Sequence, residues 1–170
     1  VALNQFFLFC KAGDSLGAAA QTFLPAALVD RKSPLAKRLI KRLVHLSVVG
    51  GLANAVLASS LPVVAGSWFT EDVAVQFLVY RVSPLLAAGL LGHCTTLMLE
   101  GVLIASNRGK WLAWVYWINS LFLVSALMTG TRVYNQGLFY VWLCLTIFQV
   151  VRLAEFGSRT WLDHWKGELP

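Results

Sequence analysis

The residues that could carry chemistry in this chain are ionisable side chains inside long apolar runs. Lys11 and Asp14 lie three residues apart in the first of these runs. Ionisable groups are costly in a bilayer, so they mark ion, proton or substrate pathways unless they pair with one another. Side chains three apart share one helix face. The spacing leaves two interpretations open: a substrate or proton site that faces a cavity, or a mutually neutralising pair that holds its helix against its neighbours.

Further charges lie toward the ends of later apolar runs. Glu100 comes shortly before the bases Arg108 and Lys110. We expect its carboxylate to snorkel to the surface or to pair with one of these bases, and a proton shuttle is the alternative. Arg152 and Glu155 are three residues apart and predict a structural ion pair.

Uncharged polar residues interrupt the same runs. Gln21, Asn54 and His93 are such residues. Polar groups in hydrocarbon are costly unless they are paired. Together with Asp14, they therefore predict one polar face that lines a cavity or meets a partner. For His93 and His45 two roles stay open, ligation of a pigment metal or hydrogen-bonded packing.

No dedicated metal site or enzyme site is expected. Cys10, Cys94 and Cys144 all lie in apolar runs and predict buried small hydrophobic residues. No Cys/His spacing resembles a zinc site. The sequence also has no GxSxG, P-loop, HExxH or dinucleotide-binding motif, so we do not expect an enzyme.

The composition predicts that these residues are held by membrane-spanning helices. The chain has 170 residues, of which 58% are hydrophobic and 13% charged, whereas soluble domains have about 25% charged residues. We predict an all-α integral membrane protein with five transmembrane helices in residues 1–156 and an interfacial tail in residues 157–170 that carries Trp161 and Trp165. The five apolar runs are 1–29, 43–66, 73–104, 111–129 and 138–156.

The third run is too long to cross a bilayer as one straight helix. At about 1.5 Å per residue, residues 73–104 would extend about 48 Å, against about 30 Å of hydrocarbon. Pro84 removes one backbone hydrogen bond inside this run. We predict a hinge at Pro84, where the helix is kinked or broken.

The basic residues indicate how the helices are oriented. Residues 30–42 hold six Lys and Arg, 67–72 none, 105–110 two, 130–137 one and the tail two. Lys and Arg accumulate on the cytoplasmic-type side, so we expect loops 30–42 and 105–110 and the tail to lie there. Orientation thus explains the net charge of +6, and no nucleic-acid partner is expected. The basic stretch 37–46 either faces lipid headgroups in general or forms a specific anionic-lipid site.

Several stretches resemble the C-terminal half of the multidrug and toxic compound extrusion (MATE) family, in particular its plastid branch. They are DSLGAAAQTFLPAAL (14–28), AKRLIKRLVHLSVVGGL (36–52), WFTEDVAV (68–75), LEGVLIASNRGKW (99–111) and QGLFYVWLCLTIFQVVRLAEFGSR (136–159). Their order and spacing are similar to helices eight to twelve of that family over essentially the whole chain. The resemblance implies half of a MATE-like bundle, without helix seven and without the first six-helix bundle.

The function implied by the resemblance is efflux of organic cations or small metabolites by proton or sodium antiport. Some relatives carry a cation-binding acid midway along helix ten, but the matching stretch here, LLGHCTT (90–96), has His93 and no acid. Alternating access needs two repeats that move against each other. We therefore expect this half not to transport alone, and to bury its cavity face against the missing N-terminal bundle or other membrane subunits.

A different class of function stays open. A half-transporter without its partner bundle fits a non-transporting structural subunit of a larger membrane assembly, such as a plastid photosystem. Such a subunit would bind lipid, chlorophyll or carotenoid. On either interpretation, the plastid resemblance implies a multi-pass protein of the chloroplast envelope or thylakoid.

Overall fold

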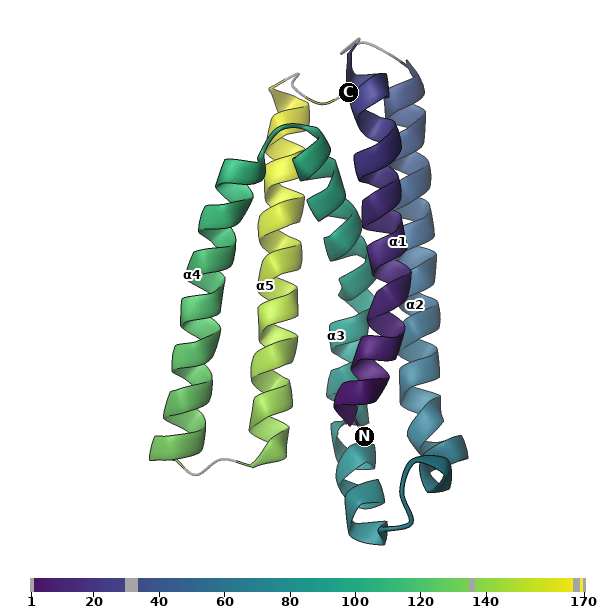
Figure 1. Ribbon diagram of the computed structural model, residues 1–170, viewed down its shortest axis with the longest axis vertical. Helices are drawn as coiled ribbons and strands as arrows, with labels where there is room; N and C mark the ends of the chain where they lie inside the picture. Colours follow the sequence, from purple (N-terminus) through teal and green to yellow (C-terminus); the bar gives the residue numbers. More distant parts are fainter. Residues whose placement is uncertain (1, 30–33, 135–136, 167–168, 170) are drawn as a thin grey trace.

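The computed structural model describes residues 2–29, 34–134, 137–166 and 169, which form an antiparallel arrangement of long helices. Figure 1 shows that successive helices run in opposite directions along the long axis of the molecule. Within the described residues there is no strand. The helices are α1 (Ala2–Leu28), α2 (Pro34–Phe69), α3 (Val73–Ala105), α4 (Gly109–Met128), with a π-helical turn at Thr129–Val133, and α5 (Leu138–Trp165).

The lengths and apolar character of these helices confirm an all-α, multi-pass membrane protein. Four stretches of the described chain are long and apolar enough to cross a membrane: Pro34–Val64, Val73–Ala105, Gly109–Arg132 and Leu138–Trp165. The helix α1 has 27 residues, which is also a spanning length. It carries Lys11 and Asp14 near its middle, as α5 carries Arg152 and Glu155.

The helix α3 lies at the centre of the bundle and packs against α1, α2 and α5. Its side chains form much of the core, and seven of them are at most 1% exposed: Leu86, Leu90, Cys94, Thr96, Met98, Val102 and Leu103. The helix α4 packs mainly against α5, and Figure 1 shows it at the outer edge of the bundle. The fold is therefore a tight group of α1, α2 and α3, to which α5 and then α4 are added.

Glycines let the backbones of α1 and α2 approach α3 closely. A Cβ on Gly101 of α3 would lie 2.4 Å from the carbonyl oxygen of Gly17 on α1. A Cβ on Gly51 of α2 would lie 2.2 Å from the carbonyl oxygen of Leu91 on α3. Small residues at helix contacts are the usual way for helices to associate in lipid, because lipid tails are as apolar as the side chains.

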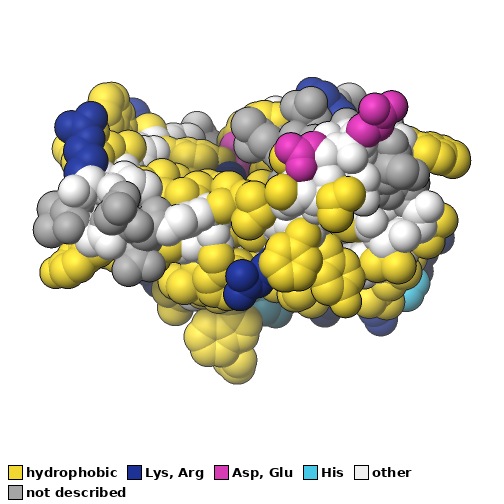
Figure 2. Space-filling view, turned by 90° about the horizontal axis from the view of Figure 1, so that it is seen from below, with side chains coloured by type: hydrophobic (Ala, Val, Ile, Leu, Met, Phe, Trp, Pro, Cys, Tyr) yellow, Lys and Arg dark blue, Asp and Glu magenta, His cyan; other side chains and the backbone are white. Residues whose placement is uncertain are grey.

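The two ends of the bundle differ in charge. The end of α1, the turn between α3 and α4, and the end of α5 lie together at the top of Figure 1. Described basic residues at this end are Lys37, Arg38, Lys41, Arg42, Arg108, Lys110, Arg159 and Lys166. Figure 2 views the opposite end, whose surface is mostly hydrophobic with few charged side chains. At that end Asp72 caps α3 by accepting from the amide of Ala74 at 2.8 Å.

The helix α3 is not broken at Pro84. It runs without interruption from Val73 to Ala105, so the break expected there is wrong, and a bend at Pro84 stays a prediction. Pro84 has no N–H to offer the carbonyl of Tyr80, four residues earlier. The hydroxyl of Ser83 donates to that carbonyl at 2.9 Å instead. Replacement of a lost backbone bond by a neighbouring hydroxyl is what allows proline inside a membrane helix.

The helix α5 also continues beyond the expected end of the last span, residue 156. It reaches Trp165, so the first part of the segment predicted as a separate tail is an extension of α5. The rings of Trp161 and Trp165 lie 5.7 Å apart in an edge-on contact, and both are exposed. Tryptophan is enriched at membrane interfaces, so an interfacial position for this end of α5 stays a prediction.

We predict that the substitutions Gly51→Ala and Gly101→Ala each destabilise the bundle. The added Cβ forces a helix pair apart, at a cost of about 1–3 kcal/mol. Thermal unfolding of the purified protein in detergent measures this as a lower Tm. The control is Gly109→Ala, because nothing lies within 4 Å of a Cβ at that position. Equal Tm values for all three variants would show that the helices do not depend on these close contacts.

We also predict that the charged end and the opposite end lie on opposite sides of the membrane. Single cysteines are introduced at Ser106, Lys166, Thr70 and Tyr134 after the three native cysteines are replaced by alanine. A membrane-impermeant maleimide applied to sealed vesicles should label the first two positions from one side and the last two from the other. Thr70 and Ser106 flank α3. Labelling of Thr70→Cys and Ser106→Cys from the same side would therefore show that α3 does not cross the membrane, and would contradict the predicted topology.

Candidate functional site

The most elaborate polar site is a buried network centred on Arg152 of α5. Its guanidinium lies 3.2 Å from the Glu100 carboxylate of α3 and 3.2 Å from the side-chain oxygen of Gln149 on α5. It also donates to the hydroxyl of Tyr116 on α4, and that hydroxyl donates to Glu100 at 2.5 Å. The network therefore joins α3, α4 and α5 through one positive and one negative side chain.

Aromatic rings enclose the cation. The guanidinium carbon of Arg152 lies 4.9 Å from the ring centre of Tyr116, 5.5 Å from that of Phe148 and 5.4 Å from that of Phe156. The faces of such rings attract a cation, and they also exclude lipid and water from it. Arg152 is 7% exposed, so its charge is stabilised almost wholly by Glu100, the rings and the hydrogen bonds.

The network extends toward the middle of the bundle through Gln149 and His93. The amide nitrogen of Gln149 lies 2.5 Å from Nδ1 of His93 on α3. Since Arg152 donates to the oxygen of Gln149, the amide nitrogen is the group that donates to Nδ1, and a neutral His93 then carries its proton on Nε2. His93 is 6% exposed, and within the described part of the chain its Nε2 is buried without a hydrogen-bond partner.

Two further polar contacts hold α5 in register. The carboxylate of Glu155 accepts from the amide of Asn119 on α4 at 2.5 Å. At the charged end, the fully buried Asp163 is bound by Arg108 at 3.0 Å and by Arg159 at 3.4 Å. Arg108 belongs to the turn between α3 and α4, so this ion pair ties the end of α5 to that turn.

The structure corrects two predicted ion pairs. Arg152 does not pair with Glu155, because each side chain has another partner: Arg152 binds Glu100 of α3 and Tyr116 of α4, and Glu155 accepts from Asn119 of α4. Glu100 pairs with Arg152 rather than with Arg108 or another base of the following turn. Helical spacing identifies which side chains share a face, but neighbouring helices decide which of them meet.

The residues predicted to share one polar face are divided between two environments. Asp14 and Gln21 are exposed on α1, and Lys11 lies 3.4 Å from Asp14. Asn54 is buried instead, and its amide donates to the carbonyl of Phe9 at 2.9 Å. His93 is also inside the bundle, so these four residues do not form the single polar face that was expected, and a cavity-lining role stays a prediction for Asp14 and Gln21. The buried Asn54 and His93 cross-link helices, whereas Asp14 and Gln21 are available to a partner or to water.

Sequence reasoning missed several members of the network. Tyr116 was not predicted, although its hydroxyl is in contact with both charges. Asp163 was not predicted either, because it lies in the segment expected to form a tail. The spacing of Gln149 and Arg152 was an available signal, since polar residues three apart on an otherwise apolar helix share a face. In the ranges that the structure describes, no group of three or more His, Cys, Asp and Glu is arranged to hold a metal ion.

The fold and this site define the class of protein as a helical, multi-pass membrane protein with charges paired inside the bundle. No family model matches the chain, and no solved structure matches it. One curated protein, "Protein DETOXIFICATION 47, chloroplastic" of Arabidopsis thaliana, is 29% identical over 162 residues. The match covers 92% of this chain but only 29% of that relative. This similarity over most of the chain supports a MATE-like relationship.

We predict that breaking the Arg152–Glu100 pair is strongly destabilising. Arg152→Gln or Glu100→Gln leaves a partly buried charge without its partner, which typically costs about 3–5 kcal/mol. The double variant Glu100→Gln/Arg152→Gln should lose less than the sum of the single losses, because neither charge remains. Thermal or denaturant unfolding in detergent measures the coupling.

The matched control is Lys11→Gln, which breaks an exposed pair. The Lys11 side chain is 82% exposed, so its loss should change stability by at most about 1 kcal/mol. Strictly additive effects of the Glu100 and Arg152 substitutions would contradict a coupled ion pair between α3 and α5.

Proposed function

We propose that this chain is the C-terminal half of a MATE-like membrane transporter, with its five helices corresponding to helices eight to twelve, and that transport requires a second helical bundle. The similarity to the Arabidopsis protein over 92% of the chain supports this proposal. The chain spans about 29% of the length of that relative, which leaves room there for a further bundle. The substrate class is organic cations or small metabolites, exchanged for protons or sodium.

The observation that carries the proposal is the polar outer face of α1. Lys11, Asp14, Ser15, Gln21 and Thr22 are all exposed, and their spacing of three, four and seven residues places them on one side of the helix. The opposite side of α1 is made of buried small and apolar residues, including Gly13, Gly17, Ala20 and Leu24.

This face does not suit lipid. The hydroxyls of Ser15 and Thr22 are satisfied by backbone carbonyls of α1, at 3.2 and 2.8 Å. The Lys11–Asp14 pair and the amide of Gln21 still require water or polar partners. A water-lined cavity between two bundles supplies this environment, and in the proposed transporter α1 forms one wall of that cavity.

Asp14 is the residue we propose for coupling. It is the acidic residue on the exposed face of α1 within the described chain, and its contact with Lys11 is solvent-accessible. A proton or cation that binds the Asp14 carboxylate competes with Lys11 for it, so the charge of the cavity wall changes when the ion binds. The buried Glu100–Arg152 pair has a different role in this proposal, because it holds α3, α4 and α5 together as one rigid body.

Two finer assignments belong to the same proposal. The positively charged end of the bundle faces the cytoplasmic-type side of the membrane. The printed name of the relative includes "chloroplastic", which supports a plastid membrane as the location.

A structural subunit of a larger membrane assembly is the second candidate, and one observation favours it. The helix α4 has a broad exposed face of large apolar side chains: Trp114, Trp117, Ile118, Leu121 and Phe122. Such a face suits lipid, but it also suits another protein or a pigment. In this alternative the polar face of α1 meets a neighbouring subunit rather than a cavity.

The two functions are separated by the native protein and its activity. We expect the 170-residue chain alone in liposomes to show no proton- or sodium-driven efflux of a cationic dye. The protein purified from its own membranes should have a mass well above 18.7 kDa and should export the dye. In that protein Asp14→Asn should abolish coupled efflux, while Thr22→Ala on the same face should leave it intact.

Two outcomes would overturn the proposal. Efflux by the isolated chain would remove the need for a second bundle. A native mass near 18.7 kDa, with co-purification of a large complex and no efflux, would establish the structural subunit.

A further inference from the structure

A shallow groove runs between α2, α3 and α5 on the side of the bundle away from the polar face of α1. It encloses about 480 Å³. Its walls are Val48 and Leu52 of α2 and Val150 and Leu153 of α5, and its floor is formed by Gly89 and Gly92 of α3.

Five residues of α3 line the groove, and two of them, Gly89 and Gly92, have no side chain; the others are Ala88, Leu91 and Thr95. A Cβ on Gly92 would lie 3.0 Å from a terminal methyl of Leu153, and one on Gly89 would lie 3.8 Å from the Thr146 hydroxyl. The walls remain open, since Val48 is 54% exposed and Leu52 is 57% exposed. These residues lie within the membrane-spanning parts of their helices, so the groove opens toward lipid tails.

Basic residues continue the same face of α2 toward the charged end. Lys37, Lys41, Val48 and Leu52 are separated by four, seven and four residues, which places them in one stripe along the helix. Lys41 precedes Val48 by about two turns, or about 10 Å along the axis. Both lysines are exposed, and the sequence from Pro34 to Phe69 contains no acidic residue.

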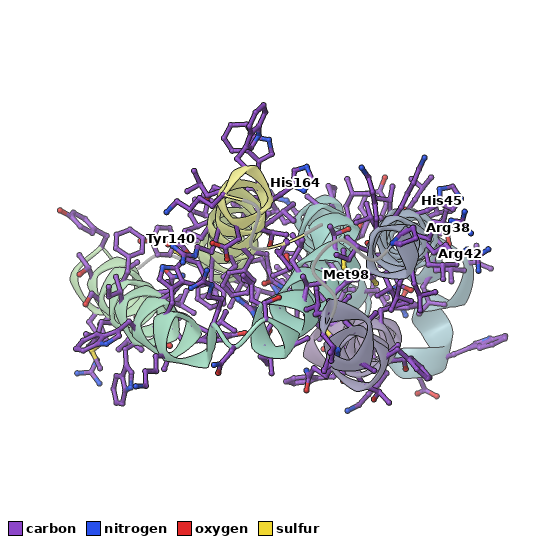
Figure 3. All side chains as sticks on the ribbon, turned by 90° about the horizontal axis from the view of Figure 1, so that it is seen from above. Arg38, Arg42, His45, Met98, Tyr140 and His164 are labelled. Carbon is purple, nitrogen blue, oxygen red and sulfur yellow. The ribbon has the colours of Figure 1, made fainter. Side chains whose placement is uncertain are left out.

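The other basic residues of this helix point elsewhere. Figure 3 shows Arg38 and Arg42 on the side of α2 that faces away from the other helices. The two lysines are therefore in line with the groove residues Val48 and Leu52, and the two arginines are not, although all four basic residues lie in the first turns of α2.

We propose that this groove and the two lysines form a binding site for an anionic phospholipid. One acyl chain lies in the groove between α2 and α5, and the phosphate binds Lys37 and Lys41, about two to three turns closer to the charged end than Val48. The charge of the headgroup is complementary to that of the lysines, and the apolar groove selects a ligand with a long chain over free phosphate. The site does not involve the polar face of α1, and it meets the Arg152 network only at Gln149, which contributes to the lining of the groove.

Native mass spectrometry of the purified full chain tests the site with defined lipids. The protein in detergent is mixed with phosphatidylglycerol or with phosphatidylcholine of the same acyl chains. Each lysine is expected to contribute about fivefold, so one phosphatidylglycerol should be retained about 25-fold more than phosphatidylcholine. Lys37→Gln/Lys41→Gln should lower phosphatidylglycerol retention by the same factor of about 25.

Three controls make the proposal falsifiable. Arg38→Gln/Arg42→Gln removes the same charge and should leave retention nearly unchanged, and equal losses in both double variants would overturn the site in favour of diffuse attraction.

Val48→Trp fills the groove and should lower retention of both lipids, while Val49→Trp, also on an exposed position of α2, should not. Glycerophosphoglycerol, the headgroup without chains, should not compete at millimolar concentration, and effective competition would overturn the role of the groove. Equal Tm values for the variants ensure that retention reports binding rather than unfolding.

Discussion

Backbone contact at Gly17, Gly51 and Gly101 determines where α1 and α2 lie on α3. In each case a Cβ would come within 2.8 Å of a carbonyl oxygen of the facing helix. Such contacts hold only one rotation of each helix about its axis, because any other rotation brings larger side chains into the interface. With the small face of α1 fixed against α3, Lys11, Asp14 and Gln21 are turned outward.

The second constraint is electrostatic and acts on α4 and α5. Their closest glycine contact is Gly130, just after α4, against the ring of Tyr140 on α5 rather than against a facing backbone, and their inner surfaces carry Arg152, Glu155 and Asn119. Polar groups in a bilayer must find partners inside the protein, so α5 is held where Arg152 meets Glu100 and where Asp163 meets Arg108. The bundle thus combines one part fixed by close packing with another part fixed by buried charge pairs.

The helices could be predicted from the sequence, whereas the partners of the polar residues could not. Apolar run length predicts α2 to α5 because about 20 apolar residues are a requirement of the bilayer itself. The predicted Arg152–Glu155 pair failed because spacing of three residues specifies a shared face but not the neighbour that face meets. Of the kink or break expected at Pro84, the break is excluded: the hydroxyl of Ser83 replaces the missing backbone bond, and run length and proline position do not reveal this. The extension of α5 to Trp165 was not predicted, because residues 157–165 are more polar than the apolar run before them. The ion pair of the buried Asp163 with Arg108 also depends on the turn after α3, which is distant in the sequence.

The polar face of α1 and the groove beside α5 both follow from the positions of the small residues along α3. Toward α1, Gly101 lets the backbone of α1 approach α3, and toward α2 the Leu91 carbonyl contacts Gly51 of α2. The partner helix fills the space in each case, so the polar side chains of α1 lie on its outer side. On the side of α5, Gly89 and Gly92 meet side chains rather than a backbone, namely Thr146 and Leu153, and a groove remains between α2 and α5. Removal of a side chain in lipid produces either a close helix contact or a groove that lipid must fill, since an empty space there loses dispersion contacts on one side. The polar face of α1 and the groove beside α5 therefore both depend on the small residues of α3. The two surfaces require different occupants: water or polar groups on α1, and a hydrocarbon chain in the groove.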